Sequence, residues 1–224
     1  MSITTETTIA QIATEYPIAT RVLARHKIDF CCGGGMALET ICEQRGLNSV
    51  DLINEIFDEL SDNSMDDNWN QRTLIELIEH ILQTHHRPLD EELPRLETML
   101  KKVHQVHHDK NPEALDQLLN VFLNMKQELM QHMDKEEALL FPLIKGGRGP
   151  EADCPIAVMQ QEHDSAGSAL QKIHELTDNF TLPEGACNSW RALWHGLEDL
   201  EKDLHLHIHL ENNILFPRAL NGDK

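Results

Sequence analysis

The sequence predicts an all-α fold, an antiparallel four-helix bundle preceded by a small helical domain. Apolar residues recur at spacings of three and four along nearly the whole chain, and the alternation typical of strands is nearly absent. The long amphipathic stretches are interrupted only by short polar or Gly- and Pro-containing segments. A chain of 224 residues can bury a core of this kind without covalent links.

The N-terminal part is expected to form short helices over roughly 8–15, 18–26, 36–45 and 49–60. Ser49 and Asp51 are good residues for the start of the last of these helices. A polar, acidic segment then follows over residues 61–68. We place the domain boundary there, which gives a small domain over residues 1–62 and a bundle over residues 70–220.

The C-terminal part is expected to form four long helices, over roughly 71–108, 113–145, 155–178 and 185–219. The breaks between them are Asn111-Pro112, the glycine-rich segment 146–150 and the segment 183–185. Because these connections are short, neighbouring helices should run antiparallel.

A motif in the second of these helices is repeated in the fourth. His132 and Glu136 recur 75 positions later as His207 and Glu211, and each Glu is followed by a Leu-Phe-Pro ending. One further histidine precedes each copy, His85 before the first and His163 before the second. A duplicated helix pair explains the pattern.

These histidines and glutamates occupy positions where the apolar stripe of each helix calls for leucine, so they should project into the bundle. Unpartnered buried carboxylates would cost several kcal/mol each, on the order of the whole stability of a domain, and a metal offsets that cost. Six nitrogen and oxygen ligands are too many for one tetrahedral zinc, but they suit two iron or manganese ions that share the glutamates. The expected ligands are His85, His132, Glu136, His163, His207 and Glu211.

We expect a non-haem Fe–O–Fe or Fe–OH–Fe centre bridged by Glu136 and Glu211. The alternative for any single histidine is an ordinary core residue bonded to a carbonyl group. His86 points about 100° away from His85 on a regular helix, so it is not expected to bind the metal and at most contacts a ligand residue. His205 and His209 share a face with charged residues and are expected to be solvated.

A second motif, Cys31-Cys32 followed by three glycines, lies in the small domain. It precedes a helix expected to begin near Met36, and thiols near a helix N-terminus tend toward the thiolate. Cys31 and Cys32 are therefore candidate catalytic thiols, acting in transfer or redox chemistry. The alternative is a pair of buried structural cysteines.

Charge and cysteine usage limit the partners and the compartment. The 19 Lys and Arg against 38 Asp and Glu give a formal charge of −19, and no basic run is longer than Lys101-Lys102. This excludes nucleic acid and anionic membrane surfaces as expected partners. Five irregularly spaced cysteines and the lack of a signal peptide or long apolar run indicate a cytoplasmic protein.

Over residues of about 70–220 the pattern resembles the haemerythrin-like HHE family. Together with the Cys-Cys-Gly-Gly motif, the whole chain resembles the iron-sulfur cluster repair di-iron proteins, the repair-of-iron-centres family. The resemblance implies a bacterial stress-response protein whose six ligands hold two irons and whose partners are damaged or apo iron-sulfur proteins. It also implies NO or O2 as small ligands, with NO reduction as a plausible activity.

Two other functions remain open at this point. One is a haemerythrin-type O2 or NO carrier or sensor, against which the cysteine pair counts. The other is a metal-free interaction module whose acidic surface docks a basic partner. A homodimer is compatible with the sequence.

Overall fold

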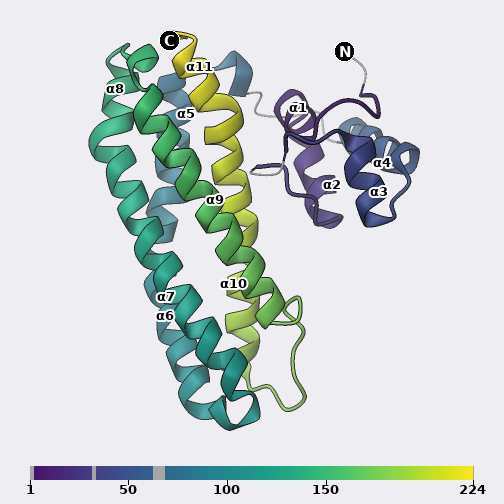
Figure 1. Cartoon of the computed structure of the whole chain (residues 1–224), viewed down its shortest axis with the longest axis vertical. Coiled ribbons are helices and arrows are strands. Elements are labelled where there is room, and N and C mark those ends of the chain that lie inside the picture. Colours follow the sequence, from purple (N-terminus) through teal and green to yellow (C-terminus); the bar gives the residue numbers. More distant parts are fainter. Residues whose placement is uncertain (1–2, 32–33, 63–68, 224) are drawn as a thin grey trace.

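The computed structural model describes residues 3–31, 34–62 and 69–223. Within these ranges the chain is helical, and the only strand-like pairing is one isolated bridge between Thr8 and Ala37. Figure 1 shows a long helical bundle with a small helical unit beside its upper half. The predicted fold class is confirmed.

The small unit contains helices α1 (Ile9–Glu15), α2 (Ala19–Arg25), α3 (Leu38–Arg45) and α4 (Ser49–Asp62). A capping box begins α1, since Thr8 Oγ1 accepts a hydrogen bond from the backbone N–H of Gln11 while Gln11 Oε1 accepts one from Thr8. Its core is an apolar cluster that includes Ile12, Leu23 and Ile56. The domain division proposed above stays a prediction, because the residues 63–68 at the boundary lie outside the described ranges.

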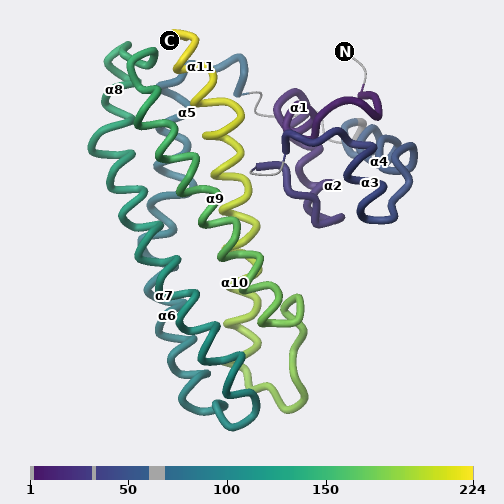
Figure 2. Tube along the Cα trace, in the orientation of Figure 1, coloured from purple at the N-terminus to yellow at the C-terminus, as the bar shows by residue number. Residues whose placement is uncertain are grey.

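The bundle has four long helices that run up and down along the trace in Figure 2. Three of them are built from consecutive segments: α5 (Leu74–Ile81), η2 (Leu82–His86) and α6 (Arg87–His107); α7 (Pro112–Lys135), η4 (Glu136–Leu140) and α8 (Phe141–Lys145); and α10 (Asn188–Leu210), η6 (Glu211–Leu215) and α11 (Phe216–Leu220). The remaining helix is α9 (Asp153–Leu176). Short 3-10 turns flank them at η1 (Trp69–Gln71), η3 (His108–Lys110) and η5 (Gly149–Glu151).

The segments η2, η4 and η6 are single π-helical turns. Each ends with a bond from the residue after the turn to the carbonyl five positions earlier, for example from Phe141 to Glu136 and from Phe216 to Glu211. The next residue in every case is a proline, which has no N–H and crowds the preceding turn. These prolines are Pro88, Pro142 and Pro217. We therefore attribute the three π turns to these prolines, and each turn adds one residue to the helical repeat.

The bundle core consists of two apolar clusters with a polar level between them. One cluster includes Leu96, Phe122 and Leu197, and the other includes Ile78 and Phe216. The buried His and Glu side chains lie along each helix between residues of the first cluster and residues of the second. The polar level is thus closed off from water by packed side chains on both sides.

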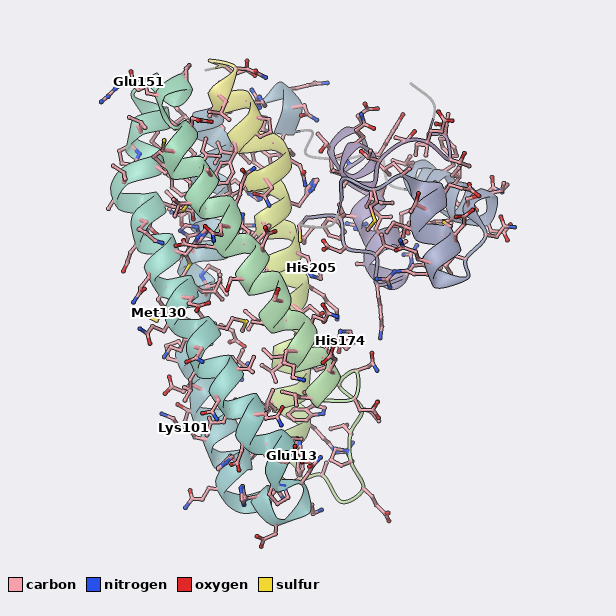
Figure 3. The ribbon with its side chains drawn as sticks, in the orientation of Figure 1. Lys101, Glu113, Met130, Glu151, His174 and His205 are labelled. Atoms are coloured by element: carbon pink, nitrogen blue, oxygen red, sulfur yellow. The ribbon has the colours of Figure 1, made fainter. Side chains whose placement is uncertain are left out.

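The small unit docks on the bundle through Phe30 and α10. Asn213 Nδ2 donates a hydrogen bond to the Phe30 carbonyl at 3.1 Å, and the Phe30 ring packs edge-on against His205 and His209. Figure 3 shows His205 and His174 on the side of the bundle that faces the small unit. The expectation that His209 is solvated is wrong: it is 3% exposed, and burial lowers its pKa to about 4.

Among the described residues, no helix is both long enough and apolar enough to cross a membrane.

Gly149 allows η5 to approach α11, which gives a test of this end of the bundle. A Cβ at this buried position would meet the carbonyl oxygen of Ala219 and lie 2.9 Å from its carbonyl carbon. Gly149→Ala should therefore lower the free energy of unfolding by about 1–3 kcal/mol in urea titrations. Gly35→Ala is the matched control, because a Cβ there has nothing within 4 Å. An equal effect of both changes would contradict the packing described.

Candidate metal centre

Buried His and Glu side chains from all four bundle helices meet at the polar level. They form two groups in which the ligand atoms lie within 4.8 Å of one another. The first group is His86, Glu136, His207 and Glu211, and the second is His132, Glu136, His163 and Glu211. Both glutamates belong to both groups.

Within each group, two imidazoles face each other through their Nε2 atoms. The separation is 3.2 Å between His86 and His207 and 3.1 Å between His132 and His163. Glu136 Oε2 lies 3.4 Å from Nε2 of both His86 and His132. Glu211 uses one oxygen for each side, with Oε1 3.1 Å from His207 and Oε2 3.1 Å from His163. Each carboxylate thus reaches both pairs of imidazoles.

The hydrogen bonding of these carboxylates fits a cation site. Glu136 and Glu211 are fully buried, yet both Glu136 oxygens and Glu211 Oε2 lack a well-aligned hydrogen bond from any described residue. Buried carboxylate oxygens are normally satisfied, so such orphans need another partner. A divalent or trivalent metal ion would be such a partner, because carboxylate oxygens and imidazole nitrogens that converge on a common point are its usual ligands.

The neighbouring imidazoles shift the pKa of Glu211, and Glu211 shifts that of His163 in turn. Burial alone would raise the pKa of Glu211, but the charges of His207 and of His163, whose Nε2 lies 3.1 Å away, outweigh it and hold that pKa well below its usual range. Burial likewise opposes the charge on His163, but its ion pair with Glu211 raises the pKa of His163 to about 9. The surroundings of Glu211 therefore favour positive charge at this level.

A second layer of side chains orients the imidazoles through their Nδ1 atoms. Acceptors lie at 3.0 Å from His86 and His132 and at 2.9 Å from His163. They are Glu137 for His86, Glu162 for His132 and Asn212 for His163. Such bonds fix the ring orientation and leave Nε2 as the ligand atom. The sequence did not single out these roles, although Glu137 and Asn212 directly follow the two repeated glutamates.

The structure brings five of the six predicted ligands together and leaves the sixth, His85, apart from them. His85 lies outside both groups; its Nδ1 bonds to Asp203 Oδ1 at 2.8 Å and its ring stacks on His207. His86 takes its place. The prediction assumed a regular helix. His86 is instead the last residue of the π turn η2, which adds one residue to the helical repeat, so His86 rather than His85 faces the other ligand residues. Pro88 was the signal in the sequence, because it disturbs the helix at this turn.

The candidate thiols are only partly described. Cys31 is buried, and both its backbone N–H and its Sγ donate to Asp29 Oδ1, at 2.9 and 3.1 Å. The second of these bonds needs the protonated thiol. The helix expected near Met36 begins at Leu38. Cys32 lies outside the described residues.

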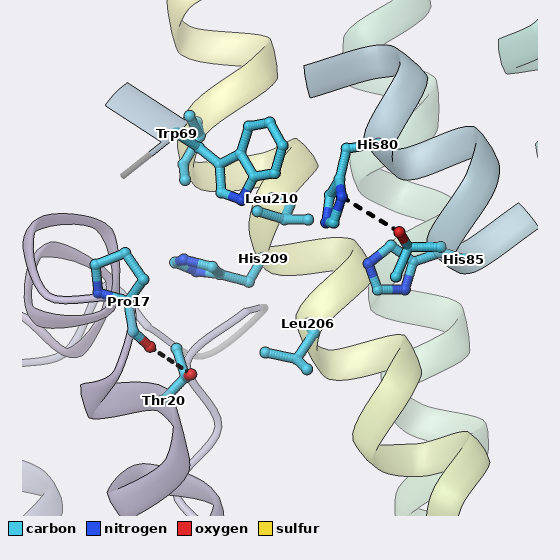
Figure 4. A pocket seen from close by; sticks show the side chains of 10 residues that line it. Pro17, Thr20, Trp69, His80, His85, Leu206, His209 and Leu210 are labelled. Carbon is cyan, nitrogen blue, oxygen red and sulfur yellow. Dashed lines mark hydrogen bonds between the residues drawn. The ribbon is translucent and has the colours of Figure 1, made fainter. Parts of the chain in front are cut away.

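Two cavities approach the centre from outside. One of about 310 Å³ lies between α7 and α9 and is lined by His132, His163 and the paired side chains of Lys135 and Glu162. The other, of about 190 Å³, lies between the small unit and the bundle. Figure 4 shows Pro17 and Thr20 on one side of it and Trp69, His80 and His85 on the other. Of the two cavities, the first is lined by residues of a ligand group, His132 and His163, whereas the second is not.

Comparisons with known proteins agree with this geometry. Residues 77–219 match the family model described as the Hemerythrin HHE cation binding domain, and residues 5–60 match a Domain of Unknown function (DUF542). Proteins named iron-sulfur cluster repair protein YtfE from Yersinia pseudotuberculosis and Yersinia pestis are each 42% identical to this chain over 217 residues, covering 96% of it and 97% of the relative. The protein of that name from Pectobacterium atrosepticum is 42% identical over 218 residues, with the same coverage.

The bundle and its small N-terminal unit are thus both matched, and the relatives are similar along nearly their whole length. The chain belongs to the haemerythrin HHE cation-binding family, in the group whose members are named iron-sulfur cluster repair proteins.

Proposed function

We propose that the bundle holds two non-haem iron ions at the polar level. His86 and His207 would serve one ion, His132 and His163 the other, and Glu136 and Glu211 both. The observation that carries the proposal is that two groups of potential ligands share the same two buried carboxylates, three of whose four oxygens lack a well-aligned hydrogen bond from a described residue. Mixed imidazole and carboxylate ligands suit iron. When bound, the iron pair would supply redox chemistry and binding positions for a small ligand such as NO or O2.

The function that this centre supports best is repair of iron-sulfur clusters damaged by nitrosative or oxidative stress. In this role iron is the cargo, delivered to damaged or apo iron-sulfur proteins. The names of relatives that match 96% of the chain favour repair over a haemerythrin-type carrier. NO reduction at the same site and a cytoplasmic location stay predictions.

Cys31 and Cys32 are assigned to iron transfer or redox steps in this proposal. Support comes from the docking of the small unit, since Phe30, the residue before Cys31, contacts His209 and Asn213. Those two residues flank Glu211 on the same helix. Phe30, the residue before Cys31, is therefore held against the helix that carries two of the metal-site residues.

Removal of either shared carboxylate should empty the centre. We expect about two irons per chain in the purified protein and less than one in Glu136→Leu or Glu211→Leu, measured by metal analysis of protein made without a histidine tag. Leucine removes a buried charge at similar volume, so the helical circular dichroism should be retained. Unchanged iron content in a folded variant would refute the assignment.

The neighbouring histidines give a matched pair. His86→Ala should lower the iron content and the iron affinity by tenfold or more, about 1.4 kcal/mol, because it removes a ligand. His85→Ala should keep about two irons per chain, because its imidazole bonds to Asp203 instead. Metal analysis after dialysis against a chelator distinguishes the two. The reverse ranking would restore His85 as the ligand.

Repair itself can be tested with an enzyme whose iron-sulfur cluster has been damaged by NO. The iron-loaded protein should restore its activity, and Glu136→Leu should not, because there is no iron to deliver. The double variant Cys31→Ala/Cys32→Ala should keep its iron but restore activity more slowly. Full recovery with the cysteine variant would remove the thiols from the mechanism and leave the metal centre intact.

A further inference from the structure

A separate group of side chains lies at the turn between α6 and α7. His104 is in the last turn of α6 and His108 begins η3, so the two histidines are four residues apart and share one face. Their rings are 4.9 Å apart. Asp116 faces them from the start of α7. This end of the bundle is the lower one in Figure 3, where Lys101 and Glu113 are labelled.

The donor atoms of this group already converge. Nε2 of His104 lies 2.7 Å and Nε2 of His108 lies 3.1 Å from the same atom, Oδ1 of Asp116. All three donor atoms lie within 4.8 Å of one another. A metal ion that replaces the protons shared by these atoms would gain three ligands with little rearrangement.

The surroundings favour a cation that exchanges with solvent. The side chains of His104, His108 and Asp116 are 25%, 39% and 54% exposed, so water can fill the remaining coordination positions. The histidines lie at the C-terminal end of α6, where the helix dipole favours positive charge. The chain as a whole carries a formal charge of −19, which attracts cations.

We propose that His104, His108 and Asp116 form a second metal site, an exchangeable surface site for a divalent first-row transition-metal ion. Two imidazoles and one carboxylate select such ions over Mg²⁺ and Ca²⁺, which prefer oxygen ligands. Zn²⁺ stands above Fe²⁺ in the usual order of affinity, so the site holds zinc in preference to ferrous iron.

The surface site is independent of the buried centre. His104 follows His86 by 18 positions in the same helix, which corresponds to about 27 Å at 1.5 Å per residue. No residue is common to the two sites. Loading of the surface site should therefore leave the iron content unchanged, and the two assignments can fail separately.

The test is calorimetric titration of Zn²⁺ into the iron-loaded, untagged full-length chain. The wild type should bind one zinc per chain in addition to its iron. His104→Ala/His108→Ala should weaken this binding tenfold or more, and Asp116→Asn should weaken it as well. Iron content, measured on every sample, should be the same throughout.

His195→Ala provides the matched control. His195 is an exposed histidine that pairs with Asp199 at 3.0 Å, but within the described part of the chain it belongs to no group of three potential ligands, so its loss should leave zinc affinity unchanged. Co²⁺ gives a second readout, because its visible absorption bands report nitrogen and oxygen coordination. Equal zinc affinity in the wild type and the double variant, or no zinc binding by the wild type, would overturn the proposal.

Discussion

The structure depends on neutralising two fully buried carboxylates. Glu136 and Glu211 are inaccessible to water, so the charge they carry must be met by cations within the bundle. Imidazoles from four helices converge on them, and apolar clusters lie above and below. This requirement places one histidine from each helix at one level, and it explains why polar residues interrupt otherwise apolar stripes.

The sequence was sufficient to predict the fold and most of the centre. Apolar spacing located the helices, and the repeated His and Glu pairs identified Glu136 and Glu211. The choice between His85 and His86 could not be made by counting along a regular helix, because a π turn changes the residues per turn where they lie. Proline two residues after the turn is the local cause, and the sequence did contain it.

The face of the bundle that the small unit covers could not be predicted from the sequence, for a different reason. His209 lies on a polar stripe of α10 that would face water in an isolated bundle. It is buried because Phe30 and its neighbours cover it, and only the tertiary arrangement of the two parts determines that. Asn213 bonds to both parts of the protein, since its Nδ2 donates to the Phe30 carbonyl of the small unit and lies 2.9 Å from His209 Nδ1 of the bundle. A polar helix face is therefore not always a solvated one.

The second layer makes the two imidazoles of each pair unequal. His86 and His132 each bond through Nδ1 to a carboxylate, which fixes the orientation of the ring. The other imidazole of each pair has no carboxylate at Nδ1: His163 bonds to a neutral amide, and His207 Nδ1 has no hydrogen bond to a described residue. Each ion in the proposed centre would thus have one imidazole oriented by a carboxylate and one that is not. Both carboxylate-bound imidazoles, His86 and His132, come from the first half of the repeat, and both others, His163 and His207, come from the second half, so the two halves differ in the partners of their imidazoles although their His and Glu positions repeat.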